Sequence, residues 1–259
     1  MDKVIIECTQ YNINMKQILK FIINLVLGKD YFRNRAFCKA SENLIKVGPE
    51  ALAAYYKVGK KLNIDFVPMF GTLLGAYREH NFIPHDDDID MALDIRFLTK
   101  ELIDSLRDSG FEINRLYINS NYIGCQLPMI FKGLVCDIYF SYSDNQKNHI
   151  YLPLAIEGHE WSYSTKMNIY RSKDVKIPTY DGFTKCKFAG TEVTIPSNTE
   201  DILTSLYGPD FMVPKKGVHA DPDVYQAPIH EVFYNCYPIS FVLEKDLITA
   251  IVKKAKMFI

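Results

Sequence analysis

The residues in this sequence best suited to chemistry form an acidic run at positions 86–90, which reads DDDID. Side chains two residues apart on a strand point to the same face, so Asp88 and Asp90 would present two carboxylates side by side. Two adjacent negative charges repel each other unless a cation neutralises them. Carboxylate oxygens suit a hard divalent cation, and we expect Mg²⁺, or Mn²⁺ in its place.

A second acidic position lies within residues 135–139, an otherwise mostly apolar run that reads VCDIY. An isolated acid in a strand is costly unless it is paired, which makes Asp137 a candidate for the same site. If this strand lies beside the first, Asp137 becomes the third carboxylate of one cluster. We therefore predict that Asp88, Asp90 and Asp137 are both the catalytic residues and the metal ligands.

A phosphate-binding turn is predicted just upstream, where Gly71 and Thr72 follow a strand-like run and open a helix. Gly71 lets the backbone approach a ligand closely, and a helix N-terminus offers free N–H groups to a phosphate. Arg78, further along this helix, would reach the same phosphates. A phosphate-binding turn beside a metal site is the arrangement that phosphoryl-transfer enzymes use.

The acidic run also resembles the start of a calcium loop, because Asp86, Asp88 and Asp90 alternate. The glycine and the closing glutamate of such a loop are missing from their required places, so we reject this reading. The six histidines show no metal-ligand spacing and the six cysteines form no CxxC pair, so we expect surface histidines and reduced, mostly buried thiols.

The elements that position these residues predict an α+β fold with a mixed sheet flanked by helices. We expect strands at residues 64–70, 88–93, 111–117, 122–131 and 134–142, and helices at about 96–109 and 197–206, the latter with Ser197 and Glu200 as a capping box. Pro49 would occupy the first turn of a helix running to Asn63. Residues 187–195 read as a hairpin, and residues 144–184 are the least readable part.

The charge and composition of the whole chain constrain its partners. The formal net charge is -1, which argues against a dedicated nucleic-acid binder. The first ten residues lack the order of a signal peptide, so we expect a cytoplasmic location. Residues 16–27 and 243–256 are apolar or amphipathic and too short to span a bilayer; we weigh packing on protein against peripheral contact with the inner membrane face.

Residues 71–93 read GTLLGAYREHNFIPHDDDIDMAL and resemble the signature of the LicD/fukutin family of phosphotransferases, a branch of the nucleotidyltransferase superfamily. A weaker match covers residues 188–214. The resemblance spans about residues 50–215, which gives a helical extension at 1–48, a catalytic domain at 49–215 and a C-terminal extension at 216–259. One departure is His85, where the family often has tryptophan, and it bears on substrate fit.

This resemblance implies transfer of a phospho-alcohol, such as phosphocholine, from a CDP-activated donor to a glycan or glycolipid hydroxyl in surface polysaccharide or lipopolysaccharide biosynthesis. It assigns the metal to Asp88 and Asp90, and gives Asp137 the role of third ligand or proton acceptor. The substrate-binding residues it implies are Gly71, Thr72, Arg78, His85 and Asp86.

Two other functions stay open at this point. A nucleotidyltransferase that moves a nucleoside monophosphate to a small molecule would share the metal site, and a non-catalytic binding protein could keep the fold. Trp161, Tyr163 and Tyr170 could form an aromatic cage for a choline group, although packing is the simpler reading. The segment from Tyr207 to Pro214 is expected to be a packed turn, with a substrate role as the alternative.

Overall fold

A computed structural model describes residues 31–144, 146–214 and 229–257 of the chain. Contacts divide the chain into two units, residues 1–39 and 40–259. The described part of the first unit is the beginning of helix α2 (Tyr31–Leu62), where Arg35 donates a hydrogen bond to the Tyr31 hydroxyl at 3.5 Å. All other described elements belong to the second unit, and the predicted helical segment at 16–27 lies outside the described residues.

The remaining helical elements are α3 (Phe70–Leu74), the π-helix η1 (Gly75–Glu79), the 3-10 helix η2 (Ile95–Phe97), α4 (Lys100–Asp108), α5 (Trp161–Met167), α6 (Thr199–Tyr207), α7 (Ile239–Glu244) and α8 (Leu247–Ala255). The strands are β1 (Val67–Pro68), β2 (Asp88–Asp94), β3 (Glu112–Ile113), β4 (Arg115–Asn119), β5 (Cys125–Phe131), β6 (Leu134–Ser143), β7 (Lys147–Leu154), β8 (Tyr170–Pro178), β9 (Phe183–Phe188), β10 (Thr191–Pro196) and β11 (Ile229–Pro238).

The described strands form a nine-stranded sheet in the order β1-β2-β6-β7-β8-β11-β4-β5-β3, together with the separate β9–β10 hairpin. β2 pairs with β6 in parallel, while the other described pairs are antiparallel. The α+β class is therefore confirmed. The sheet is more than a mixed sheet flanked by helices, because a further pairing between β6 and β5 closes β6, β7, β8, β11, β4 and β5 into a ring.

Apolar side chains at helical and strand spacing build the core. On α2, Leu44, Ala51, Leu52 and Tyr55 are fully buried, spaced as one face of a helix requires. The prediction that Pro49 occupies the first turn of a helix is wrong, because Pro49 lies inside α2. The burial of this face explains why the helix continues through the proline. The apolar face continues past Pro49 and offsets a proline cost of about 3 kcal/mol.

Two further predictions need correction. The strand expected at 64–70 is reduced to Val67–Pro68, because Pro68 has no N–H to donate and Phe70 turns into the left-handed region at φ +50°. The capping box at α6 does not form, since Asn198 is the N-cap residue and Glu200 instead accepts a hydrogen bond from the Tyr77 hydroxyl.

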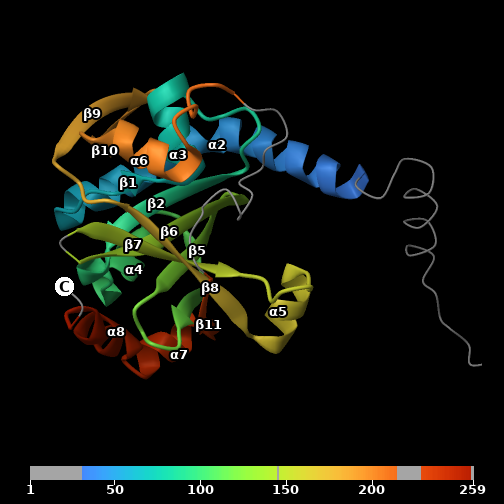
Figure 1. The fold of residues 1–259 in the computed structure, drawn as a ribbon, viewed down its shortest axis with the longest axis vertical. Coiled ribbons are helices and arrows are strands. Elements are labelled where there is room, and N and C mark those ends of the chain that lie inside the picture. Colours follow the sequence, from blue (N-terminus) through green and yellow to red (C-terminus); the bar gives the residue numbers. More distant parts are fainter. Residues whose placement is uncertain (1–30, 145, 215–228, 258–259) are drawn as a thin grey trace, which may run out of the picture. The chain divides into compact units, whose positions relative to one another are not determined.

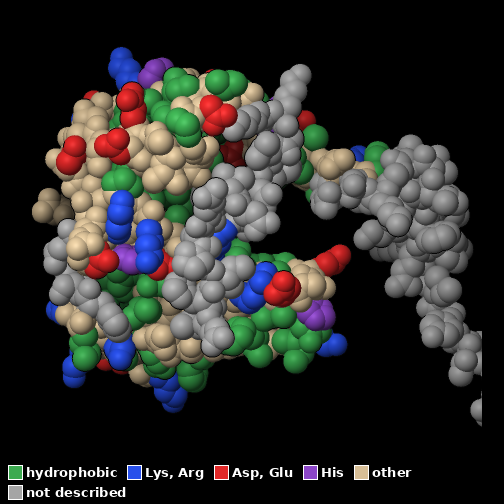
Figure 2. Space-filling view, viewed as in Figure 1, with side chains coloured by type: hydrophobic (Ala, Val, Ile, Leu, Met, Phe, Trp, Pro, Cys, Tyr) green, Lys and Arg blue, Asp and Glu red, His purple; other side chains and the backbone are tan. Residues whose placement is uncertain are grey.

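The arrangement of the helices is visible in Figure 1, where α3, α6 and the β9–β10 hairpin lie together above the sheet and α7 and α8 lie below it. The face in Figure 2 carries both acidic and basic side chains, and neither sign covers it. α8 packs on the domain with Ile251 and Ala255 fully buried, as the packing alternative expected. Among the described residues, no helix combines the length and the apolarity needed to span a bilayer.

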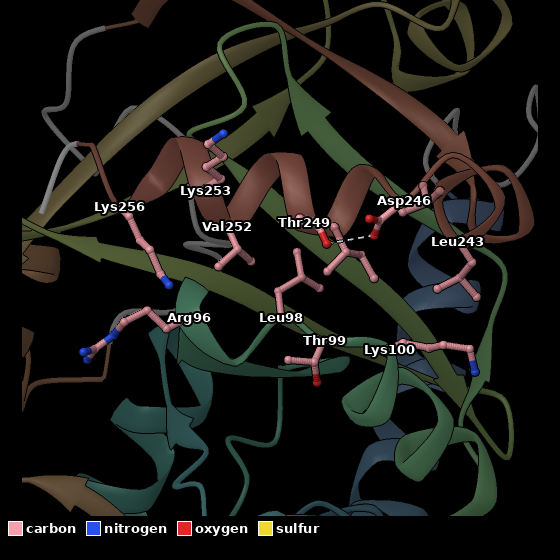
Figure 3. A pocket seen from close by; sticks show the side chains of 12 residues that line it. Arg96, Leu98, Thr99, Lys100, Leu243, Asp246, Thr249, Val252, Lys253 and Lys256 are labelled. Carbon is pink, nitrogen blue, oxygen red and sulfur yellow. Dashed lines mark hydrogen bonds between the residues drawn. The ribbon is translucent and has the colours of Figure 1, made fainter.

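A groove of about 420 Å³ lies between α8 and the segment that leads from η2 into α4 (Figure 3). Leu98 and Val252 line its apolar part, and the basic side chains of Arg96 and Lys256 both lie at one end of it. The groove adjoins the C-terminal end of β2, and none of the predicted site residues lines it.

Candidate functional site

Three carboxylates meet where β2 and β6 run side by side. The parallel register places Asp90 opposite Asp137, and Asp88 precedes Asp90 by two residues on the same strand. Residues opposite each other share a face of the sheet, as do residues two apart, so all three side chains lie on one face. One oxygen from each of the three lies within 4.8 Å of the others.

This cluster is largely withdrawn from water. Asp90 is 9% exposed and Asp137 is 7% exposed, and the Oδ1 atom of each is buried without a hydrogen-bond partner. A buried carboxylate oxygen without a donor is costly. The two orphaned oxygens therefore indicate a ligand that binds carboxylates on this face.

Burial and mutual repulsion oppose ionisation of the cluster. Burial first, and then the charge of Asp88, raise the pKa of Asp90 well above its usual value. Burial followed by the charge of Asp86 raises the pKa of Asp88 in the same direction. Burial raises the pKa of Asp137 to about 7, against a hydrogen bond from Gln126 and the charge of Arg115, which lower it. A divalent cation would reverse these shifts, because it favours the ionised form of every ligand.

The donor set fits Mg²⁺ or Mn²⁺. All three groups are hard oxygen ligands, and each can offer an oxygen to the same point. A second group of close carboxylates, Asp86, Asp87 and Asp88, shares Asp88 with the first. Asp86 and Asp87 lie in the loop before β2, where Asp86 Oδ1 accepts a hydrogen bond from the Asp87 amide at 3.1 Å. The buried trio is the better cation site, because it contains the orphaned oxygens.

Gly71 and Thr72 both support the carboxylates from α3. Thr72 Oγ1 accepts a hydrogen bond from the Asp90 amide at 2.9 Å, and the Met69 amide donates to the Asp90 carbonyl at 2.9 Å. Asp90 is therefore fixed on both sides of its α-carbon. At Gly71, a β-carbon would lie 2.3 Å from Asp86 Oδ2, so only glycine admits the Asp86 carboxylate. Their contact with donor phosphates stays a prediction.

Arg78 has partners of its own in the described structure. Its Nη1 atom donates to the Phe211 carbonyl at 2.9 Å, and its Nε atom donates to Glu79 at 2.8 Å. These bonds tie η1 to the segment after α6, in line with the packed turn expected there, where Phe211 is also buried. His85 is exposed in the loop before β2. Phosphate binding by Arg78 and substrate contact by His85 stay predictions.

Sequence reasoning did not identify two polar residues of the same sheet face. Gln126 on β5 lies opposite Tyr139 on β6, and its Nε2 atom donates to the Tyr139 hydroxyl at 3.3 Å. Gln126 also donates the hydrogen bond that lowers the pKa of Asp137. A buried glutamine in the apolar run of β5 was the available signal, since such a side chain needs polar partners.

Two of the three aromatic residues considered for a choline cage pack against each other. Tyr170 is buried, and its ring lies 4.8 Å from that of Trp161 and 5.0 Å from that of Tyr117. Tyr163 stacks on His159 at 3.9 Å instead. Packing therefore accounts for the buried Tyr170, whereas Trp161 and Tyr163 are exposed and a cage role for these residues stays a prediction.

The chain resembles known proteins over the part that carries this site. A family model described as LicD/FKTN/FKRP, nucleotidyltransferase domain, matches residues 63–198. Ribitol-5-phosphate transferase FKTN from Homo sapiens and from Macaca fascicularis is 24% identical over 186 residues, which cover 70% of this chain and 35% of the relative. Uncharacterized protein T07A5.1 from Caenorhabditis elegans is 31% identical over 130 residues, 49% of this chain and 33% of its own. The chain thus spans about a third of the length of the curated relatives it matches.

Proposed function

Because the chain belongs to the LicD/FKTN/FKRP nucleotidyltransferase-domain family, we propose that it transfers a phospho-alcohol from a CDP-activated donor to a glycan hydroxyl, with a divalent metal. The observation that carries this proposal is the convergence of Asp88, Asp90 and Asp137 within 4.8 Å on one sheet face. Two buried oxygens in this cluster lack hydrogen-bond partners. Such a set suits a cation that binds phosphates, and phosphoryl transfer depends chiefly on positioning and charge neutralisation.

Each residue has a defined part in this proposal. Asp88 and Asp90 would hold Mg²⁺ or Mn²⁺, and Asp137 would complete the ligand set. Thr72 fixes the backbone of Asp90 through the 2.9 Å hydrogen bond described above. When bound, the metal neutralises charge on the donor diphosphate.

The reaction is an in-line displacement at phosphorus. The glycan hydroxyl oxygen attacks the phosphorus that bears the alcohol, and a new oxygen–phosphorus bond forms. The bond from that phosphorus to the bridging oxygen breaks, and CMP leaves with the bonding electrons. The hydroxyl proton passes to a base. Asp137 would take this role as the alternative to serving as the third metal ligand.

The group transferred is part of the proposal. Two matched relatives are named ribitol-5-phosphate transferases, so ribitol 5-phosphate is the first group to test. Phosphocholine, which the sequence motif suggests, is the second. A surface glycan as acceptor, a cytoplasmic location and peripheral contact with the inner membrane face stay predictions.

Thermal stabilisation by CDP-ribitol, CDP-glycerol, CDP-choline, CTP and ATP, each with and without Mg²⁺, tests this function. A ligand that binds only the folded state raises the melting temperature as its concentration exceeds its dissociation constant. Metal-dependent stabilisation by one CDP-alcohol, followed by release of CMP from it, supports the transferase. Response to CTP or ATP alone supports nucleotidyl transfer, and no response supports a non-catalytic protein.

Variants link the activity to the cluster. Asp88→Asn and Asp90→Asn should each abolish CMP release while the melting temperature shows an intact fold. Asp94→Asn is the matched control, because Asp94 lies at the other end of β2, where it binds Arg96 at 2.8 Å. Full activity in either cluster variant contradicts the proposal.

A further inference from the structure

The sheet face that carries the carboxylates continues onto β5 and β4. Asp137 and Tyr139 lie two apart on β6, and Tyr139 is opposite Gln126 on β5. Gln126 is in turn opposite Tyr117 on β4. Arg115 precedes Tyr117 by two residues on the same strand, so its side chain lies on the face that carries the carboxylates.

The register also sets the distance between the guanidinium strand and the carboxylate strand. β4 and β6 are the two neighbours of β5 in this part of the sheet. Neighbouring strands lie about 4.8 Å apart, so β4 and β6 are about 10 Å apart. A long arginine side chain on β4 and a short carboxylate on β6 then face the same space above β5. The charge of Arg115 accordingly lowers the pKa of Asp137.

The surroundings of Arg115 leave its charge available. It is exposed, and its charge opposes the rise that burial causes in the pKa of the Cys236 thiol on β11, opposite Tyr117. Among the residues that the structure describes, Arg115 forms no ion pair with an acid. Arg78, by contrast, is bonded to the Phe211 carbonyl and to Glu79. Arg115 is therefore the guanidinium on the carboxylate face that can bind an anion without breaking an ion pair.

A cation site and a free guanidinium on one face match a ligand with two anionic groups. One group would bind the cation held by the carboxylates, and the other would bind the arginine, which suits phosphate oxygens because it offers two parallel donors. We propose that Arg115 binds one phosphate of a diphosphate whose other phosphate binds the metal at Asp88, Asp90 and Asp137. The diphosphate of a CDP-activated donor has this form, and to that extent the inference rests on the proposed function.

The test uses full-length protein and two inorganic probes, pyrophosphate and phosphate, titrated calorimetrically at a fixed excess of Mn²⁺. Loss of charged hydrogen bonds from one residue weakens binding by about 10- to 100-fold. We expect Arg115→Met to weaken pyrophosphate binding to this extent and to change phosphate binding less than about twofold, because one phosphate binds the metal alone. Arg96→Met removes the same charge from a residue outside the site and should change neither.

Arg115→Lys keeps the charge but not the paired donors, so it should recover part of the pyrophosphate affinity. If Arg115→Met does not fold, Arg115→Lys serves as the test in its place. A pyrophosphate affinity that is about threefold or more below that of the wild type then supports the proposal. Unchanged pyrophosphate binding in folded variants overturns it. A wild-type protein that binds pyrophosphate no better than phosphate overturns it as well.

The two proposals can fail separately. If pyrophosphate binding depends on Arg115 but the protein releases no CMP from any CDP-alcohol, the proposed role of Arg115 is supported and the proposed transferase activity is contradicted. If the protein releases CMP but its pyrophosphate affinity is unchanged by substitution of Arg115, the transferase activity is supported and the role of Arg115 is contradicted.

Discussion

Replacing Asp137 by asparagine should stabilise the metal-free protein. Burial raises the pKa of this carboxyl from 3.8 to about 7. Each pH unit of difference corresponds to about 1.4 kcal/mol, so ionised Asp137 lowers the free energy of unfolding by up to about 4 kcal/mol. Asparagine has nearly the same shape and carries no charge. Its side-chain oxygen can still accept the hydrogen bond from Gln126.

The sign of the pH dependence follows from the raised pKa. Below about pH 4, Asp137 is protonated in both the folded and the unfolded protein, so the variant and the wild type should have similar stability. As the pH rises from about 4 to about 7, the unfolded state releases this proton first and the wild type loses stability. Above about pH 7 the difference in favour of Asp137→Asn should reach its maximum.

The assay is chemical denaturation between pH 4 and pH 8 in the presence of a chelator, with thermal melting as a second readout. At this chain length, each kcal/mol shifts the melting temperature by about 2–4 °C. Added Mg²⁺ should then stabilise the wild type at pH 8 and have little effect on the variant. Asp94→Asn should lose a little stability, because Asp94 binds Arg96 at 2.8 Å, and should keep the full response to Mg²⁺.

Two results would refute this reasoning. If Asp137→Asn is less stable than the wild type at pH 8 without metal, the ionised Asp137 carboxylate does not lower the free energy of unfolding. An equal response of both proteins to Mg²⁺ would mean that Asp137 does not contribute to the cation site.

Two further substitutions test how α3 supports the cluster. Gly71→Ala places a β-carbon 2.3 Å from Asp86 Oδ2 and should cost about 1–3 kcal/mol of unfolding free energy by overpacking, measured by denaturation, with weakened Mn²⁺ binding; a variant as stable as the wild type would show that the loop moves freely. Thr72→Val removes the acceptor of the Asp90 amide and should cost about 1–3 kcal/mol, whereas Thr72→Ser should retain most of the stability; equal losses in both would contradict the hydrogen-bond explanation.

The sequence was sufficient where the information is local. Alternation with a period of two predicted a strand at 88–93, and β2 runs Asp88–Asp94. The same rule placed Asp88 and Asp90 on one face. Whether Asp137 joins them depends on which strands are neighbours, and the parallel pairing of β2 with β6 meets that condition.

The closure of the sheet could not be predicted, because it depends on pairings between distant segments. β11, from the C-terminal part of the chain, lies between β8 and β4. β8 also breaks the expected alternation, since Lys173 and Asp174 are both buried next to each other. Arg115 was missed for a related reason: only the register across three strands places it on the face of Asp137.

Asp88, Asp90 and Asp137 are proposed to hold a divalent cation together. Anomalous diffraction from crystals grown with Mn²⁺ tests this proposal most directly. We expect one strong anomalous peak within about 2.5 Å of an oxygen of each of these three carboxylates, and its loss in Asp90→Asn crystals. Absence of a peak at this position, or a peak bound by Asp86 and Asp87 alone, would contradict it.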